Sequence, residues 1–231
     1  MAYVFPAPPQ ASLAVQGSDE RFPVRRIFCV GRNYEAHARE MGNDPDREPP
    51  FFFTKPADAV CDTPCTIPYP TLTNDLHHEI ELVIAIGKGG SNIAPTNVMD
   101  HIWGASVGID LTRRDLQAEA KKTRRPWDWS KAFDLSAPIA PIKPIAAVPS
   151  LTQGRIWLAV NGEIRQDGDI ADLIWPVVDH IATLSEGMAL APGDLVMTGT
   201  PAGVAALAAG DTVTGGVDGI AEFTLTIGPS A

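Results

Sequence analysis

Short apolar runs, separated by Gly and Pro, make up most of the chain and predict strands rather than long helices. The expected strands cover 26–30, 51–55, 79–86, 103–111, 155–160, 163–166, 195–197, 211–214 and 221–227. Asn161-Gly162 stands between two of them and is typical of a type I′ hairpin turn. A helical pattern is expected over 34–41, 95–101, 112–122 and 172–184. The pattern predicts a mainly β (α+β) protein with a few short helices.

The strand expected over 79–86 carries two acidic side chains in an otherwise apolar run. Residues two apart on a strand share a face, so Glu79 and Glu81 project together, with Ile80 and Leu82 packed behind them. Ionised carboxylates repel each other and are costly to bury, which calls for a cation between them. Mg²⁺ and Mn²⁺ prefer such oxygen ligands. The strand that ends near Asp110 supplies a third carboxylate. The alternative to a metal site is that Glu79 and Glu81 lie on an edge strand whose acidic face is solvated.

A candidate acid–base pair lies on the first expected helix, for which Asn33 is the predicted N-cap and Gly42 the C′ residue. His37 and Glu40 are three residues apart and share a helix face. A carboxylate beside an imidazole orients it and raises its basicity, as a general base requires. The alternative is an ordinary surface pair.

The region 113–125 reverses the charge of the chain, with six Lys or Arg residues against two acids. Arg114, Gln117 and Lys121 fall on one face of the expected helix, which suits a small anionic ligand. The alternative is a solvated helix face. Lys131 lies in an aromatic-rich segment expected to be a loop, and the loop 199–204 could offer Thr200 and backbone N–H groups to a ligand carboxylate. The polar loop 43–50 is a candidate lid.

The segment Gly104-Ala105-Ser106-Val107-Gly108 fits the GxSxG nucleophile pattern of serine hydrolases. That pattern needs a helix directly after the serine, whereas here a strand continues. His180 with Asp172 or Asp179 would complete a triad only in an unusual spacing. A metal-independent serine hydrolase using Ser106 is therefore the weaker hypothesis, and small residues that let two sheets approach are the better interpretation.

The composition and the net charge indicate which classes of protein the chain can belong to. The chain has 231 residues, 45% hydrophobic and 20% charged, as in an ordinary globular protein. A net charge of −10 argues against nonspecific binding to nucleic acid or to an anionic membrane. Three Cys without a CxxC pair predict reduced thiols in a cytoplasmic protein. The N-terminal sequence does not have the pattern of a signal peptide, and no apolar run is long enough to span a membrane.

Six motifs occur in a fixed order over residues 26–227: GRNYxxHxxE, HHExE, TxRDxQ, PWxxxKxFD, NGExRQ and PGDxxxTGTPxGV. This order resembles the fumarylacetoacetate hydrolase family, and within it the short acylpyruvate hydrolases. The run 22–60 is most similar to the bacterial fumarylpyruvate hydrolases of gentisate catabolism. The resemblance implies a mixed β-sandwich or β-roll with few helices, a homodimer, and a single catalytic domain over 26–231 that follows an N-terminal arm over 1–25.

The resemblance also implies roles for individual residues. Glu79, Glu81 and Asp110 would hold one Mg²⁺ or Mn²⁺ per subunit, and His37, oriented by Glu40, would activate water. Lys131 would lie at the reacting oxygen, and Arg114, Gln117 and Thr200 would line the site of an anionic 2-oxo acid. The implied reaction is hydrolysis of the C–C bond of an acylpyruvate, fumarylpyruvate giving fumarate and pyruvate.

Two alternatives use the same site. Oxaloacetate could be decarboxylated or tautomerised through the same enolate, and a metal-stabilised binding protein would leave His37 and Glu40 without a use. One residue departs from the family pattern: Ala205 stands where similar members tend to have Gly, which affects the expected shape of the loop but not the metal ligands.

Overall fold

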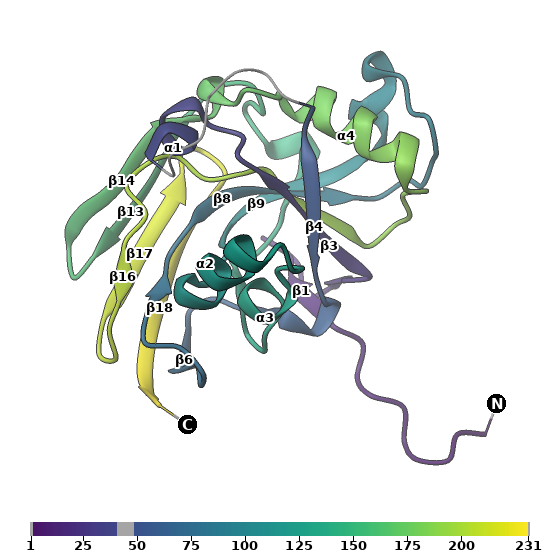
Figure 1. The fold of residues 1–231 in the computed structure, drawn as a ribbon. Coiled ribbons are helices and arrows are strands. Elements are labelled where there is room, and N and C mark those ends of the chain that lie inside the picture. Colours follow the sequence, from purple (N-terminus) through teal and green to yellow (C-terminus); the bar gives the residue numbers. More distant parts are fainter. Residues whose placement is uncertain (1, 41–48, 231) are drawn as a thin grey trace.

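The computed structural model describes residues 2–40 and 49–230, and two β-sheets dominate it (Figure 1). The larger sheet has eight strands in the order β4-β3-β15-β8-β9-β11-β5, with β12 paired to β9. The smaller sheet has five, in the order β14-β13-β17-β18-β6. The larger sheet contains a parallel pair, β15 with β3, and an antiparallel pair, β8 with β9. The expected mixed sheet architecture with few helices is confirmed.

The strands of the larger sheet are β3 (Arg26–Gly31), β4 (Phe51–Lys55), β5 (Val60–Asp62), β8 (Ile80–Ile86), β9 (Ile102–Ile109), β11 (Ala137–Ile139), β12 (Lys143–Pro144) and β15 (Asp194–Met197). Those of the smaller sheet are β6 (Cys65–Tyr69), β13 (Arg155–Val160), β14 (Glu163–Asp169), β17 (Thr212–Val217) and β18 (Ala221–Ser230). Two small sheets comprise β7 (Leu76–His77), β10 (Thr112–Arg113) and β16 (Ala206–Leu207), and β1 (Ser12–Ala14) and β2 (Arg21–Pro23).

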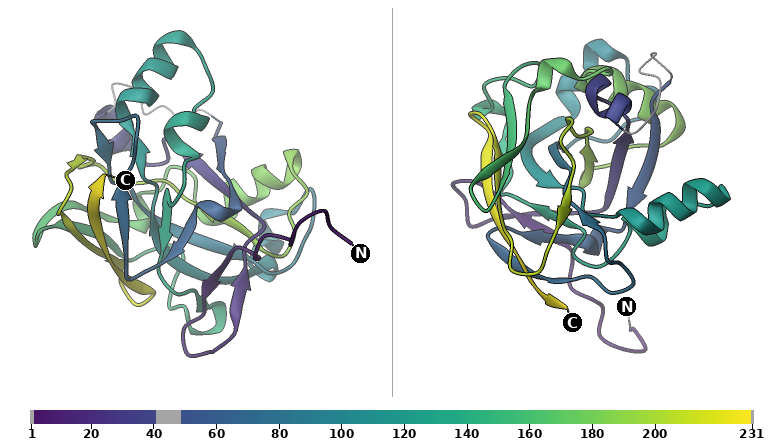
Figure 2. Two further views of the ribbon diagram at one scale, coloured as in Figure 1. Left: turned by 90° about the horizontal axis from the view of Figure 1, so that it is seen from below. Right: turned by 60° about the vertical axis from the view of Figure 1, so that its left-hand side comes forward.

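The helices of the described chain are short: α1 (Glu35–Glu40), α2 (Arg114–Thr123), α3 (Asp128–Lys131) and α4 (Val177–Gly187). Single 3₁₀ segments cover Ala57–Ala59, Pro95–His101, Ile145–Ala147 and Ile170–Asp172. Helix α2 projects from the sheets (Figure 2, right). No helix of the described part is long and apolar enough to cross a bilayer.

Several boundaries differ from the sequence-based expectation. The helix expected over 172–184 begins at Val177, because Pro176 fits the N-cap position but not a helix interior. The expected loop around Lys131 contains the four-residue helix α3. Gly42 and the proposed lid as far as Glu48 lie outside the described residues. The Asn161-Gly162 turn is confirmed, since both residues have the positive φ of a type I′ turn, at 52° and 82°.

Asn33 is not the helix cap that its position suggested. Its side-chain amide donates to the backbone carbonyls of Trp175 and Thr198, at 3.0 and 2.8 Å, and its oxygen accepts from the Trp175 N–H at 2.7 Å. The side chain therefore ties the segment before α1 to the segment before α4 and to the end of β15. The Asn33 side chain thus makes tertiary hydrogen bonds in place of the expected helix cap.

Strand β8 is buried on both faces, which explains its nearly continuous apolar sequence. Ile80, Leu82, Ile84 and Ile86 point into the main core between the two large sheets. Val83 and Ala85 point the other way, into a second core that includes Leu13 of the β1–β2 hairpin. Glu79 and Glu81 continue the face of Val83, so the acidic pair lies in the interior, not on a solvated edge.

Candidate active site

Three carboxylates meet where β8 begins and β9 ends. The antiparallel register pairs Ile80 with Ile109, and the Asp110 N–H donates to the Glu79 carbonyl at 2.8 Å. One oxygen from each of Glu79, Glu81 and Asp110 lies within 4.8 Å of the others. All three side chains are buried, with 5%, 2% and 0% of their residue surface exposed. The pair predicted from alternation on one strand and the third carboxylate predicted at the end of another are therefore together.

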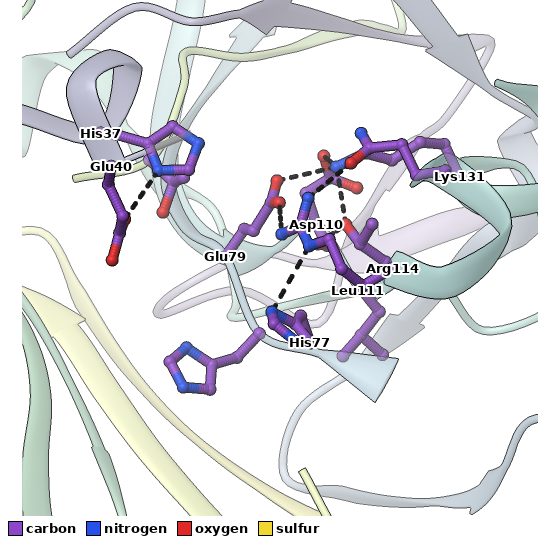
Figure 3. Close-up of polar contacts among 12 residues, drawn as sticks. His37, Glu40, His77, Glu79, Asp110, Leu111, Arg114 and Lys131 are labelled. Atoms are coloured by element: carbon purple, nitrogen blue, oxygen red, sulfur yellow. Dashed lines mark hydrogen bonds and ion pairs between the residues drawn. The ribbon is translucent and has the colours of Figure 1, made fainter. Parts of the chain in front are cut away.

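Cationic side chains surround two of the carboxylates (Figure 3). Lys131 Nζ lies 2.7 Å from Glu79 Oε2 and 2.5 Å from Asp110 Oδ2, and Arg114 forms an ion pair with Glu79 Oε1. Burial alone would raise the pKa of Glu79, but Lys131 and Arg114 hold it well below its usual range. Burial would also lower the pKa of Lys131, and Asp110 and Glu79 raise it instead. These groups are therefore charged.

Glu81 forms no ion pair with a basic side chain of the described residues, and the nearby charge of Lys131 offsets its burial only in part. Its Oε2 accepts the backbone N–H of Gly199 at 2.8 Å. Burial, together with repulsion from Asp110 and Glu79, raises the pKa of Glu81 well above its ordinary value. Glu81 is therefore the carboxylate of the cluster that a bound cation would stabilise most. An all-oxygen donor set of this kind fits a hard divalent ion such as Mg²⁺ or Mn²⁺.

His37 and Glu40 form the pair that the helix spacing predicted. His37 Nδ1 lies 3.2 Å from Glu40 Oε2, and Glu40 also accepts the backbone N–H of Gly203 at 3.1 Å. A hydrogen bond to the carboxylate assigns a proton to Nδ1, and in the neutral ring Nε2 is then the acceptor. Figure 3 shows that the ring nitrogen not bonded to Glu40 faces the side where Glu79 lies. His37 is buried and lines the same pocket as the three carboxylates.

Glycine is required at two positions of the loop that follows β15. Gly199 has φ +101° and Gly203 has φ +97°, a conformation that other residues rarely adopt. A Cβ on Gly203 would lie 2.0 Å from the Arg165 carbonyl oxygen. The loop thus brings one N–H to Glu81 and another to Glu40. Between the two, Thr200 lines the pocket, as do Arg114 and Gln117.

Gln166 fixes the orientation of Thr200, and sequence reasoning did not single it out. Gln166 Oε1 accepts from the Ile80 N–H at 3.1 Å, so its Nε2 is the donor to Thr200 Oγ1 at 2.8 Å and to the Pro201 carbonyl at 2.8 Å. Thr200 Oγ1 therefore accepts from Gln166 and keeps its own proton to donate elsewhere. Because Thr200 lines the pocket, its hydroxyl proton is available for a hydrogen bond to a ligand there.

Lys55 is a second residue that the sequence reasoning missed. Its side chain is fully buried, with Nζ 2.8 Å from Asp110 Oδ1, and it also donates to the backbone carbonyls of Leu111 and Lys131. A signal was present in the sequence: Phe51, Phe53 and Lys55 alternate on one face of a strand, and a lysine on an apolar face needs a buried partner. Its partner lies 55 residues away, so the chain order alone did not identify it.

The serine-hydrolase hypothesis is wrong. Ser106 is fully buried in β9, and its hydroxyl donates to the Ala140 carbonyl at 2.7 Å. His180 lies in α4, where Nδ1 bonds to the Trp175 carbonyl at 3.2 Å, and burial lowers its pKa to about 4. Neither residue lines the pocket that contains the carboxylates. The small residues of β9 serve close packing, which was the preferred interpretation of this segment of the sequence.

Comparison with known proteins agrees with this geometry. Residues 26–228 match the family described as fumarylacetoacetate (FAA) hydrolase C-terminal. The chain belongs to the fumarylacetoacetate hydrolase family. A fumarylpyruvate hydrolase from a Ralstonia species is 43% identical over 192 residues, which cover 82% of this chain and 100% of that one. The family-level prediction from the six motifs is confirmed, and so is the family-type fold.

Two further relatives bear on the chemistry. The crystal structure of a Pseudomonas aeruginosa fumarylpyruvate hydrolase in complex with Mn²⁺ and pyruvate is 49% identical, with a TM-score of 0.96 over 99% of this chain and 100% of that chain. A mitochondrial oxaloacetate tautomerase of Arabidopsis thaliana is 40% identical over 202 residues, covering 87% of this chain and 90% of that protein. The family fold therefore accompanies more than one reaction of 2-oxo acids.

Replacing Lys55 by Met should lower the free energy of unfolding by about 3–5 kcal/mol, because Asp110 would lose a buried cationic partner. Urea denaturation in the presence of a chelator measures this. Lys122→Met, which removes an exposed lysine, is the control and should change stability by less than about 0.5 kcal/mol. Equal stability of the two variants would show that Lys55 does not compensate Asp110.

Proposed function

We propose that this protein is a divalent-cation-dependent hydrolase that cleaves the C–C bond of an acylpyruvate, with fumarylpyruvate giving fumarate and pyruvate. The observation that carries the proposal is that one pocket contains both the buried cluster of Glu79, Glu81 and Asp110 and the His37–Glu40 pair. A cation site alone would suit a binding protein, but an oriented imidazole beside it suits hydrolysis. The relatives named as fumarylpyruvate hydrolases support the choice of substrate.

Glu79, Glu81 and Asp110 would hold one Mg²⁺ or Mn²⁺ per chain. When bound, the cation supplies Lewis-acid chemistry, which makes a 2-oxo acid electrophilic and stabilises the negative charge of an enolate leaving group. The chain contributes the geometry: β8 and β9 fix the three carboxylates, and the Gly199 N–H orients Glu81.

His37 would take a proton from the attacking water at Nε2, while Glu40 holds the ring and stabilises its positive charge. The water oxygen forms a bond to the acyl carbonyl carbon, and the C–C bond to the pyruvyl unit breaks. The proton on His37 can then return to the pyruvate enolate, which balances the reaction.

Lys131 would stabilise the oxyanion that forms on the acyl carbonyl. Its three protons face Glu79, Asp110 and Thr112, the last at 2.6 Å. The role therefore requires one of these protons to be redirected to the substrate. Arg114, Gln117 and the Thr200 hydroxyl would bind the substrate carboxylate.

The second candidate reaction is tautomerisation or decarboxylation of oxaloacetate. The 40% identical tautomerase supports it, because both reactions pass through the enolate of a 2-oxo acid. Hydrolysis needs a water beside His37, and the alternative does not.

We further propose that residues 26–231 form the catalytic unit and residues 1–25 an arm over it, and that the enzyme is a cytoplasmic homodimer of aromatic catabolism that binds neither membranes nor nucleic acid. The net charge of −10 supports the last point, and the burial of Leu13 against the second core supports the arm.

A substrate panel tests the function directly. Fumarylpyruvate, maleylpyruvate and acetylpyruvate are followed by loss of their enol absorbance, and oxaloacetate by pyruvate release, each with Mn²⁺ or with a chelator. We expect metal-dependent turnover that is fastest with fumarylpyruvate. Turnover of oxaloacetate alone would favour the second candidate, and activity that survives chelation would contradict the cation requirement.

Glu81→Gln should lose bound Mn²⁺ and at least about 100-fold in kcat/KM, because Lewis-acid stabilisation contributes several kcal/mol. Metal content by elemental analysis and initial rates measure the two effects. Glu186→Gln, an identical change on the surface of α4, should leave both unchanged. Full activity and full metal content in Glu81→Gln would refute the proposed metal site.

His37→Gln should lower kcat by about 10²–10⁴-fold with Mn²⁺ content preserved, because it removes the proton acceptor and none of the carboxylates. Glu40→Gln should show a smaller loss, since the ring stays but its orientation weakens. Glu35→Gln, an exposed change in the same helix, is the control. Normal rates in His37→Gln would assign water activation to another group.

A further inference from the structure

We propose that Lys121 and Arg32 form a subsite for a carboxylate at the far end of the acyl group, so that the enzyme selects acylpyruvates with two carboxylates. The proposal rests on the proposed hydrolase function and deepens it. The roles proposed above assign no binding partner to the acyl half of the substrate. Lys121 and Arg32 would be the residues that determine specificity for that half.

Both cations line the pocket that contains the carboxylate cluster. Arg32 directly follows β3, and Lys121 lies in the last turn of α2, on the face that also carries Arg114 and Gln117. Burial, reinforced by the charges of Arg114 and Arg32, lowers the pKa of Lys121. The two side chains therefore come from segments that are distant in sequence, and both line the same pocket.

These two cations differ from the other basic groups of the pocket in their pairing. Lys55 is paired with Asp110, Arg114 with Glu79, and Lys131 with both carboxylates. Within the described ranges 2–40 and 49–230, no carboxylate forms an ion pair with Lys121 or Arg32. Adjacent positive charges without an acidic partner repel each other and favour an anion between them.

An aromatic wall connects the inner and outer cations. Trp127 packs edge-on against Phe51 and Phe53, with ring centroids 5.5 and 5.6 Å apart. Lys131 Nζ lies 5.1 Å from the Phe53 ring centroid, at the carboxylate cluster. At the other end, Arg32 Cζ lies 5.5 Å from the centroid of Phe51. Lys121 Nζ lies 5.4 Å from the centroid of Trp127, the ring that packs against both phenylalanines.

The dimensions of this wall suit a short, planar, unsaturated acyl chain. Phe51 and Phe53 are two positions apart in β4, which separates them by about 6–7 Å along the strand. A trans-unsaturated four-carbon acyl group is planar and extended, so it can lie flat against aromatic rings while its two ends point in opposite directions. If its carbonyl carbon reacts beside Lys131, its terminal carboxylate points along the wall into the part of the pocket lined by Arg32 and Lys121. An acetyl group would fill only the inner half.

The test compares two substrates that differ in the distal carboxylate. Lys121→Met keeps the apolar stem over Trp127 and removes the charge. It should lower kcat/KM for fumarylpyruvate by about 10- to 100-fold, the value of one charged hydrogen bond, and leave acetylpyruvate within about twofold. Arg32→Met should act in the same direction. Lys121→Arg should restore most of the preference because it restores the charge.

Lys122→Met is the matched control, since it removes the same charge from the same helix at an exposed position outside the pocket. It should leave the ratio of the two substrates unchanged. An equal loss on both substrates in Lys121→Met, or no loss on either, would overturn the proposed subsite.

A binding measurement separates this proposal from the proposed reaction. Calorimetry on the Mn²⁺-loaded protein compares fumarate with crotonate, which has a methyl group in place of one carboxylate. The wild type should bind fumarate about tenfold more tightly, and Lys121→Met should remove the difference. Equal binding by the wild type would overturn the subsite, whereas the expected binding without hydrolysis of either acylpyruvate would overturn only the proposed function.

Discussion

The buried carboxylates of Glu79, Glu81 and Asp110 impose the constraint on which the rest of this structure depends. Three negative charges in the interior of a sheet must be compensated, and the surrounding chain is arranged to do so. Lys55 arrives from β4, Lys131 from α3 and Arg114 from the start of α2. These segments are far apart in sequence, and their ion pairs with the carboxylates hold them together around the cluster. Glu81 is the member of the cluster that has no ion pair with these cations, and a bound divalent ion would contact it directly.

The loop after β15 couples this cluster to the rest of the pocket. Its Gly199 N–H binds Glu81 and its Gly203 N–H binds Glu40, so one loop orients a proposed metal ligand and the partner of the proposed base. Gln166 of β14 holds Thr200 between them. The smaller sheet thereby contributes to a site whose acidic groups belong to the larger one. Ala205, the departure from the family pattern, follows these contacts and leaves them in place.

The cations of the pocket fall into two groups with different uses. The inner ones are neutralised by carboxylates of the chain and set the charge balance of the proposed catalytic centre. Lys121 and Arg32 have no such partner among the described residues and lie against the aromatic wall, Arg32 at Phe51 and Lys121 at Trp127. In the proposed enzyme this division gives a physical basis for two kinds of selectivity: the inner groups would serve any 2-oxo acid, and Lys121 and Arg32 would distinguish the acyl chain.

The sequence by itself determined the local features of this protein. Period-two alternation identified β8 and its acidic pair, helical spacing joined His37 to Glu40, and the order of six motifs identified the family. Such signals depend on neighbours along the chain, which a sequence displays. Only the tertiary structure decided which groups meet across the sheets: Lys55 with Asp110, Gln166 with Thr200, and Asn33 with Trp175 instead of its own helix. The reason is that a buried polar group bonds to whichever partner the fold brings to it, and chain order does not encode that distance.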